Sequence, residues 1–126
     1  MYEISAVGHF DAAHFLRGYR GKCANIHGHR WKVEVTLQGA ELNNLGILTD
    51  FMVVKNMLKE ILNIFDHRMI NDITPFAQVN PTAENLAKYV FDEMAVKLRE
   101  LTGPGVKMTK VTVWESEAAS ATYSEE

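Results

Sequence analysis

The feature that most constrains the fold of this chain is a strict two-residue alternation between His27 and Leu37. One face of this segment carries two histidines followed by apolar side chains, and the other carries glycine, charged residues and threonine. A period of two is typical of a strand with one buried face. Because His27 and His29 are two residues apart, both rings project from that buried face. The segment therefore predicts a half-buried strand that begins with a pair of inward imidazoles.

The N-terminal segment has the same period and places a third histidine, His14, on its apolar face. A single inward histidine is more often a core residue than a metal ligand. Three such rings at the open ends of two neighbouring apolar faces have few polar partners, which buried imidazoles require. We therefore expect His14, His27 and His29 to bind Zn²⁺ as a catalytic three-histidine site with one open position. His9 falls on the opposite strand face, and we expect it to be a solvated surface residue.

Composition limits the class of protein. The chain has 126 residues, one cysteine and a net charge of −3. Its length favours one domain over residues 1–126, and a single cysteine excludes an internal disulfide and favours a reducing, cytoplasmic location. The negative charge argues against nucleic-acid binding. The N-terminus has a strand pattern and not that of a signal peptide, and no apolar run approaches the roughly 18 residues of a membrane span, so we expect no membrane association.

Basic residues gather around the histidines. Five of them, with no acidic residue, lie between positions 16 and 33: Arg17, Arg20, Lys22, Arg30 and Lys32. Such a run of charge is commonly a solvated loop. Because these side chains flank the histidines, they are equally consistent with a site for a polyanion such as a phosphate chain.

The remaining sequence predicts two helices and two more strands. After the second strand, the apolar positions change to the 3.6-residue period of helices. Asp50 is suited to cap the first helix, and Asn80 or Thr82 the second. The expected strands are 2–15, 28–38, 108–116 and 118–123, and the expected helices run from 50 to about 66 and from 80–82 to a Gly-Pro-Gly break at 103–105.

The order β-β-α-α-β-β predicts an α+β domain with two helices on one face of an antiparallel four-stranded sheet. Such a sheet has a second face and two edges, and edges in native proteins are covered or paired. Trp114 falls on the face opposite Val111 and Val113, so that second face is not purely polar. We therefore expect the chain to oligomerise through its sheet.

Four further residues offer reactive chemistry. Cys23 precedes the histidine pair in a basic loop, with three residues between them, and it suits a fourth metal ligand, a small buried hydrophobe or a thiolate base. In Asp66-His67, a carboxylate adjacent to an imidazole can fix the ring tautomer and stabilise its cation. Glu115 is either an exposed strand-end residue or, on the face of Val111, an inward acceptor for a ligand ring that carries amino and imino hydrogens.

A cupin metal motif is an alternative interpretation of the histidine segment. The pattern Gly21-x5-His27-x-His29-x4-Glu34 would make Glu34 a ligand. Strand parity argues against it, because Glu34 falls on the face opposite both histidines unless a bulge intervenes. Two central helices also do not suit a jelly-roll barrel.

Several short motifs in a fixed order resemble a known family. They are Phe10-Asp11-Ala12-Ala13-His14, Cys23-x3-His27-Gly28-His29, Leu48-Thr49-Asp50-Phe51, Asp66-His67, Pro81-Thr82-Ala83-Glu84-Asn85 and Trp114-Glu115. Together they closely resemble the 6-pyruvoyl-tetrahydropterin synthase family over nearly the whole chain. The resemblance implies the tunnelling fold, a β-β-α-α-β-β unit whose sheets join into an oligomeric barrel, typically a homohexamer built as a dimer of trimers.

The resemblance also implies roles for the candidate residues. It implies zinc on the three histidines, and Cys23 as the proton acceptor supported by His67 and Asp66. It implies that Glu115 anchors a pterin ring beside the segment Thr82, Ala83 and Glu84. The active site would lie between subunits, and the substrate would be 7,8-dihydroneopterin triphosphate, whose tail suits the basic segment.

The spacing between Cys23 and His27 is similar to one branch of the family. Three intervening residues resemble the bacterial and archaeal 6-carboxy-5,6,7,8-tetrahydropterin synthases of the queuosine pathway, which release acetaldehyde and triphosphate. The pyruvoyl-forming branch, with a longer gap, is the alternative, and a third branch has glutamate in place of the cysteine. A zinc- and pterin-binding protein without turnover is a further alternative, against which the presence of Cys23, His67 and Glu115 argues.

Overall fold

The computed structural model describes residues 1–102 and 105–126. Its elements are β1 (Tyr2–His14), β2 (His27–Gly39), α1 (Phe51–Leu62), β3 (Arg68–Met69), α2 (Ala83–Thr102), β4 (Val106–Ser116) and β5 (Ala119–Ser124), with short 3-10 turns at Lys22–Ala24 and Ile70–Asp72. The long elements confirm the predicted order β-β-α-α-β-β. Of the predicted helix break at 103–105, Gly103 and Pro104 lie outside the described residues. None of the described helices is long and apolar enough to cross a membrane.

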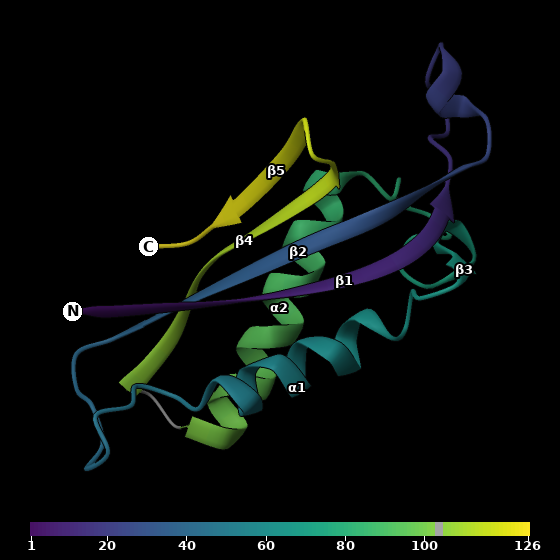
Figure 1. The fold of residues 1–126 in the computed structure, drawn as a ribbon. Helices are drawn as coiled ribbons and strands as arrows, with labels where there is room; N and C mark the ends of the chain where they lie inside the picture. The colour runs from purple at the N-terminus through teal and green to yellow at the C-terminus, as the bar shows by residue number, and fades with distance from the viewer. Residues whose placement is uncertain (103–104) are drawn as a thin grey trace.

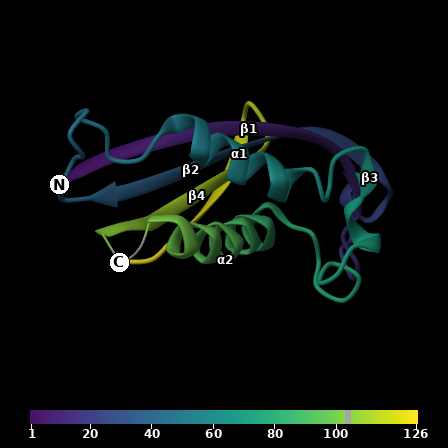
Figure 2. The ribbon, with the colours of Figure 1, turned by 90° about the horizontal axis from the view of Figure 1, so that it is seen from below.

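The sheet has the strand order β3-β1-β2-β4-β5, and both helices cover the same face of it (Figures 1 and 2). The four long strands pair with one another in antiparallel fashion. The prediction of four strands was wrong by one, because β3 adds two residues parallel to β1, with Ala12 opposite Arg68. A two-residue strand is too short to produce a detectable period in the sequence.

The hydrophobic core fills the space between the sheet and the helices. Trp31, Val33, Val35 and Leu37 are fully buried on β2, which confirms the inward face predicted from the alternation. Each such side chain stabilises the fold by roughly 1.5–3 kcal/mol. Gly8 lets α1 approach β1 closely, because a Cβ atom at this position would lie 2.9 Å from Leu62 Cδ1.

The helices begin where the sequence predicted. The Asp50 carboxylate accepts a hydrogen bond from Met52 N, and Thr82 Oγ1 accepts one from Asn85 N, so both are N-caps. The end of α1 was predicted too late, because the helix stops at Leu62 and residues 63–67 form turns.

The first two strands extend beyond the rest of the sheet at one end. β1 pairs with β2 along its whole length, from Tyr2 opposite Gly39 to His14 opposite His27. β4 pairs with β2 only from Lys32 onward, so residues 27–31 have β1 as their one strand partner among the described residues. From this end the loop between β1 and β2 projects away from the helices (Figure 1), and the histidines lie at its base.

Candidate metal centre and active site

The three predicted histidine ligands converge at the base of this loop. The centroids of the His14 and His27 rings are 4.5 Å apart, those of His14 and His29 are 5.1 Å apart, and those of His27 and His29 are 4.9 Å apart. One ring nitrogen from each histidine lies within 4.8 Å of the others. The strand register produces this cluster, because His14 is directly opposite His27 while His29 is opposite Ala12.

The hydrogen bonds of these rings leave nitrogen lone pairs available. His14 Nδ1 lies 2.7 Å from the Pro81 carbonyl oxygen, and His27 Nδ1 lies 2.7 Å from that of Asn25. A ring that donates from Nδ1 to a carbonyl presents an unprotonated Nε2, which is the usual arrangement of a metal-bound histidine. His14 Nε2 and His29 Nε2 are both buried without a hydrogen-bond partner among the described residues. Buried polar atoms rarely stay unpaired, so this donor set fits a metal ion such as Zn²⁺.

Burial favours the neutral, metal-binding form of two of these rings. Desolvation lowers the pKa of His14 and that of His29 from the ordinary value, and the Glu115 carboxylate opposes this effect at both rings. Glu115 Oε1 is 3.9 Å from His14 Nε2, and Oε2 is 4.0 Å from His29 Nε2. Strand parity had allowed an inward Glu115, and the structure places its carboxylate beside the histidines.

We expect the metal-free protein to lose stability as the pH falls below 6.5. The pKa of His14 and that of His29 are lowered from 6.5 in the folded state. The unfolded chain therefore binds more protons below that pH, and protonation favours unfolding. The melting temperature of metal-free protein, measured from about pH 7.5 to about pH 5.5, should decrease. His29→Phe should weaken this dependence and His9→Ala should leave it unchanged, whereas pH-independent melting of the wild type would contradict the expectation.

A cavity of about 220 Å³ adjoins Glu115. It is lined by Ala83, Glu84, Glu115 and residues 119–121 of β5, so the structure brings together three of the residues expected at a pterin site. Thr82 is not among the lining residues, and its hydroxyl caps α2 instead. The contribution of β5 was missed from the sequence, because it follows from the pairing of Trp114 with Ser120.

Asp66 and His67 form a second cluster at the edge of the sheet. His67 Nδ1 is 2.9 Å from Asp66 Oδ2, and Asp66 Oδ1 accepts a hydrogen bond from Asp11 N. The Asp11 N–H, followed by the His67 ring, lowers the pKa of Asp66 below its ordinary value. The His67 side chain is 77 % exposed, and its φ of 60° turns the chain from α1 into β3. The ligand atoms of this pair form a cluster with Asp11 that is distinct from the cluster of the three histidines, although His67 and His29 line one open cavity of about 490 Å³.

Cys23 lies in the 3-10 turn of the projecting loop and is half-buried. Its carbonyl oxygen accepts a hydrogen bond from Leu16 N at 2.8 Å. Within the described residues, the cluster of metal-ligand atoms contains the three histidines and not the Cys23 thiol. Among the described residues of one chain, Cys23 and His67 therefore do not join the three histidines in one cluster of ligand atoms.

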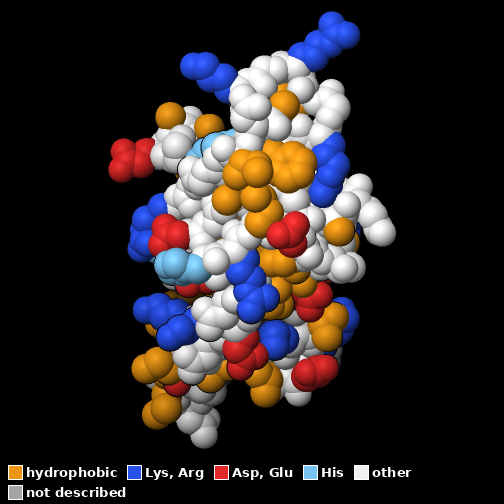
Figure 3. All heavy atoms as spheres, turned by 90° about the vertical axis from the view of Figure 1, so that its right-hand side faces the viewer, with side chains coloured by type: hydrophobic (Ala, Val, Ile, Leu, Met, Phe, Trp, Pro, Cys, Tyr) orange, Lys and Arg blue, Asp and Glu red, His pale blue; other side chains and the backbone are white. Residues whose placement is uncertain are grey.

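The five basic residues do not form one patch. Arg17 turns inward, and its Nη2 donates to the carbonyl oxygens of Phe76 and Asn71 at 3.0 and 3.4 Å. Basic side chains project from the tip of the β1–β2 loop, at the top of Figure 3, where Arg20 and Lys22 are exposed.

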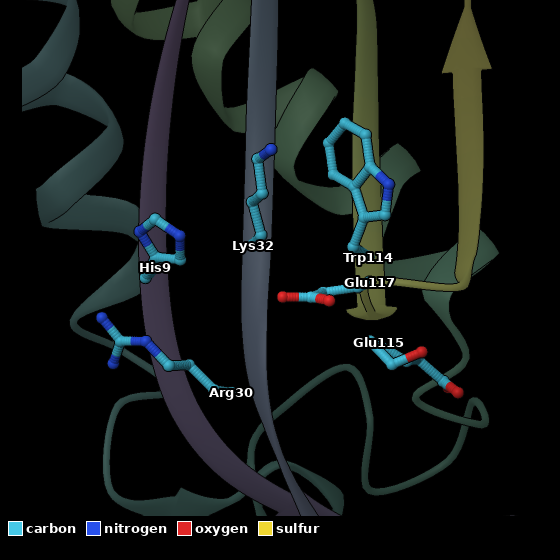
Figure 4. A pocket seen from close by; sticks show the side chains of 7 residues that line it. His9, Arg30, Lys32, Trp114, Glu115 and Glu117 are labelled. Carbon is cyan, nitrogen blue, oxygen red and sulfur yellow. The ribbon is translucent and has the colours of Figure 1, made fainter.

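The other two basic residues lie on the sheet face away from the helices. With His9 and Trp114, Arg30 and Lys32 line a cavity of about 570 Å³ (Figure 4). Lys32 Nζ is 4.5 Å from the centroid of the Trp114 ring. His9 is exposed, which confirms its predicted surface position. A single phosphate-binding surface made of all five residues is therefore not present on one chain.

Comparisons with known proteins agree with this arrangement. The family model described as 6-pyruvoyl tetrahydropterin synthase matches residues 3–126. A 6-carboxy-5,6,7,8-tetrahydropterin synthase of Aquifex aeolicus is 32 % identical over 99 % of both chains. One of Bacillus subtilis is 34 % identical over 79 % of this chain and 70 % of the relative. The structure of Caenorhabditis elegans 6-pyruvoyl tetrahydropterin synthase is similar with a TM-score of 0.83, at 26 % identity over 99 % of this chain and 96 % of that one.

Proposed function

The chain belongs to the 6-pyruvoyl tetrahydropterin synthase family, and we propose that it is a zinc-dependent lyase that forms 6-carboxy-5,6,7,8-tetrahydropterin. Its substrate is 7,8-dihydroneopterin triphosphate, and the other products are acetaldehyde and triphosphate. The observation that carries this proposal is the three-histidine cluster with two unpaired buried Nε2 atoms beside Glu115. The names of the bacterial relatives support the carboxy branch, and we assign the reaction to queuosine biosynthesis in the cytoplasm.

His14, His27 and His29 hold the zinc in this proposal. When bound, zinc supplies a Lewis acid that polarises the hydroxyl oxygens of the substrate side chain. The carbonyl of Pro81 keeps the His14 ring in the tautomer that leaves Nε2 unprotonated. The Trp31 ring packs edge-on against His14 and His29, at centroid distances of 4.8 and 5.1 Å, and excludes water from the inner side of the site.

Glu115 binds the pterin ring in the cavity that it lines with Ala83 and Glu84. Its carboxylate can accept two hydrogen bonds, which matches the amino and imino donors on one edge of a pterin. The same carboxylate lies just beyond hydrogen-bond distance of two histidine rings, at 3.9 and 4.0 Å. A ring held there places its side chain next to the imidazoles.

We expect Glu115→Gln to weaken pterin binding by about 1.5–3 kcal/mol, because one charge-assisted pair of hydrogen bonds is lost. Calorimetry with the pterin product measures the change directly. Glu117→Gln is the matched control, because Glu117 lies two residues away and shares with Glu115 the cavity on the outer sheet face, but does not line the candidate pterin cavity beside Ala83. Equal affinity of wild type and Glu115→Gln would remove Glu115 from the pterin site.

Cys23 removes the carbon-bound proton of the substrate, and the Asp66–His67 pair relays it. Asp66 accepts a hydrogen bond from Asp11 N and faces His67 Nδ1 at 2.9 Å, so it fixes the ring and stabilises its cation. Because Cys23 belongs to neither cluster of ligand atoms among the described residues, we propose that this pair serves the Cys23 of a neighbouring subunit.

A homohexamer, built as a dimer of trimers, supplies such neighbours. Over residues 2–11, the edge of β1 away from β2 has no strand partner among the described residues, and neither does the outer edge of β5. Unpaired edges of this length are commonly covered in native proteins. Pairing of these edges between chains would join the sheets into the proposed barrel.

Formation of 6-pyruvoyl-tetrahydropterin, with the side chain retained, is the second candidate function. The similarity to the Caenorhabditis elegans 6-pyruvoyl tetrahydropterin synthase supports it. Zinc-loaded protein incubated with 7,8-dihydroneopterin triphosphate distinguishes the two, with products identified by mass spectrometry and acetaldehyde by a coupled alcohol dehydrogenase. We expect the carboxy product with acetaldehyde. Triphosphate release without acetaldehyde would establish the pyruvoyl reaction, and absence of turnover would favour a zinc- and pterin-binding protein.

A further inference from the structure

Two asparagine side chains hold the segment that joins His14 to the loop of Cys23. Asn71 Oδ1 accepts a hydrogen bond from Phe15 N at 2.9 Å, and its Nδ2 donates to Phe15 O at 3.0 Å. Asn80 does the same at Arg17, with Oδ1 accepting from N at 2.9 Å and Nδ2 donating to O at 3.0 Å. Each amide therefore satisfies both backbone groups of one residue, as a neighbouring strand would. We call these two side chains the asparagine clamp.

The two clamped residues flank Leu16, whose backbone hydrogen bond holds the backbone of Cys23. Leu16, the residue between the two clamped ones, donates its N–H to Cys23 O at 2.8 Å. The loop that follows contains Gly18 and Gly21, both with positive φ, and glycine has wide backbone freedom. With both flanking residues fixed, the Leu16 N–H has a defined direction, and so has the backbone of Cys23.

Asn80 and its neighbour Pro81 also contact the candidate metal ligand His14 and the start of α2, where the candidate pterin segment lies. Pro81, next to Asn80, accepts the hydrogen bond of His14 Nδ1. The Asn80 carbonyl oxygen accepts hydrogen bonds from Thr82 N and Asn85 Nδ2, both at 2.9 Å, and this fixes it to the start of α2. The Asn71 side chain is 3 % exposed, so its polar atoms are buried for these bonds.

We propose that Asn71 and Asn80 are positioning residues, which set where Cys23 lies relative to His14 at the metal centre. Neither side chain has to touch the substrate or the metal for this role. The consequence for catalysis rests on the proposed function, because it requires Cys23 to act as the base. The consequence for loop structure does not, because it follows from the hydrogen bonds alone.

Asn80→Ala tests the proposal, since Asn80 is only half-buried and its loss should leave the fold intact. We expect amide exchange at Leu16 to accelerate by about thirtyfold, as the loss of two hydrogen bonds of ordinary net strength implies. Cys23 is the only cysteine of the chain, so alkylation by iodoacetamide reports on it alone and should also become faster. In the active enzyme, kcat should decrease by about tenfold or more while KM changes little.

Asn43→Ala is the matched control. Asn43 Oδ1 also accepts two backbone hydrogen bonds, from Leu45 N and Ile47 N, in an exposed turn, and its loss should change none of these quantities. Asn80→Asp keeps the acceptor and loses the donor, so an intermediate exchange rate is expected, and this variant replaces Asn80→Ala if the latter does not fold.

Unchanged Leu16 exchange and unchanged Cys23 alkylation in folded Asn80→Ala would overturn the proposal. A decrease in kcat without either change would also overturn it, since Asn80 would then act directly on the substrate. Exchange and alkylation need no substrate, so they decide the role of the clamp even if the wild-type protein fails to convert dihydroneopterin triphosphate.

Discussion

Cys23→Ala should lower turnover by about 10²–10⁴-fold, the contribution typical of a general base, while zinc content and assembly stay at the wild-type level. The side chain is half-buried in a projecting loop, so its truncation removes little packing. Its thiol is not part of the three-histidine cluster among the described residues, so the metal should remain. Steady-state kinetics, metal analysis and light scattering on the same sample measure the three quantities.

Mixed oligomers test whether Cys23 of one subunit and His67 of another form one active site. Cys23→Ala and His67→Ala should each be inactive alone, and should recover part of the activity after they are dissociated and reassembled together, because some sites then combine two intact residues. A fully active monomer would contradict this arrangement. Loss of zinc from Cys23→Ala would instead assign the thiol to the metal.

His14→Ala should lose zinc and, with it, turnover. His14 is 1 % exposed, and its ring packs against both other histidines. Loss of an outer-shell partner of a metal ligand typically costs 10–100-fold in metal affinity, so removal of a ligand itself should cost at least about 100-fold. A zinc titration with a competing chelator measures the affinity.

His9→Ala is the control for this variant. His9 lies on the same strand but is exposed on the opposite face, so the zinc affinity of the His9→Ala protein should equal that of the wild type. Retention of wild-type affinity by His14→Ala would remove this residue from the metal site.

The histidine cluster was predictable because it depends on parity and register. Alternation places His14, His27 and His29 on inward faces, and antiparallel pairing of two consecutive strands brings their ends together. The order of the long elements was predictable because hydrophobic period and capping residues are local properties of the sequence. Parity left Glu115 open between an exposed strand-end residue and an inward one, and its distance from the histidines could not be predicted.

Features that depend on distant segments were not predictable. β3 exists because Arg68 and Met69 pair with β1, and two residues leave no periodic signal. Arg17 turns inward because backbone carbonyls 54 and 59 residues later accept its hydrogen bonds. The hydrogen-bond partner of His14 is the carbonyl oxygen of Pro81. Every residue carries a backbone carbonyl, so this partner cannot be predicted from the sequence.

The measurement that tests the metal centre most directly is zinc X-ray absorption on the purified protein. Three nitrogen neighbours at about 2.0–2.1 Å, with one further light atom at the open position, are the result expected for His14, His27 and His29. Absence of zinc, or a sulfur neighbour at about 2.3 Å, would contradict the account. Cys23 is the only cysteine in the chain, so such a sulfur neighbour would identify Cys23 as a zinc ligand and not as the catalytic base.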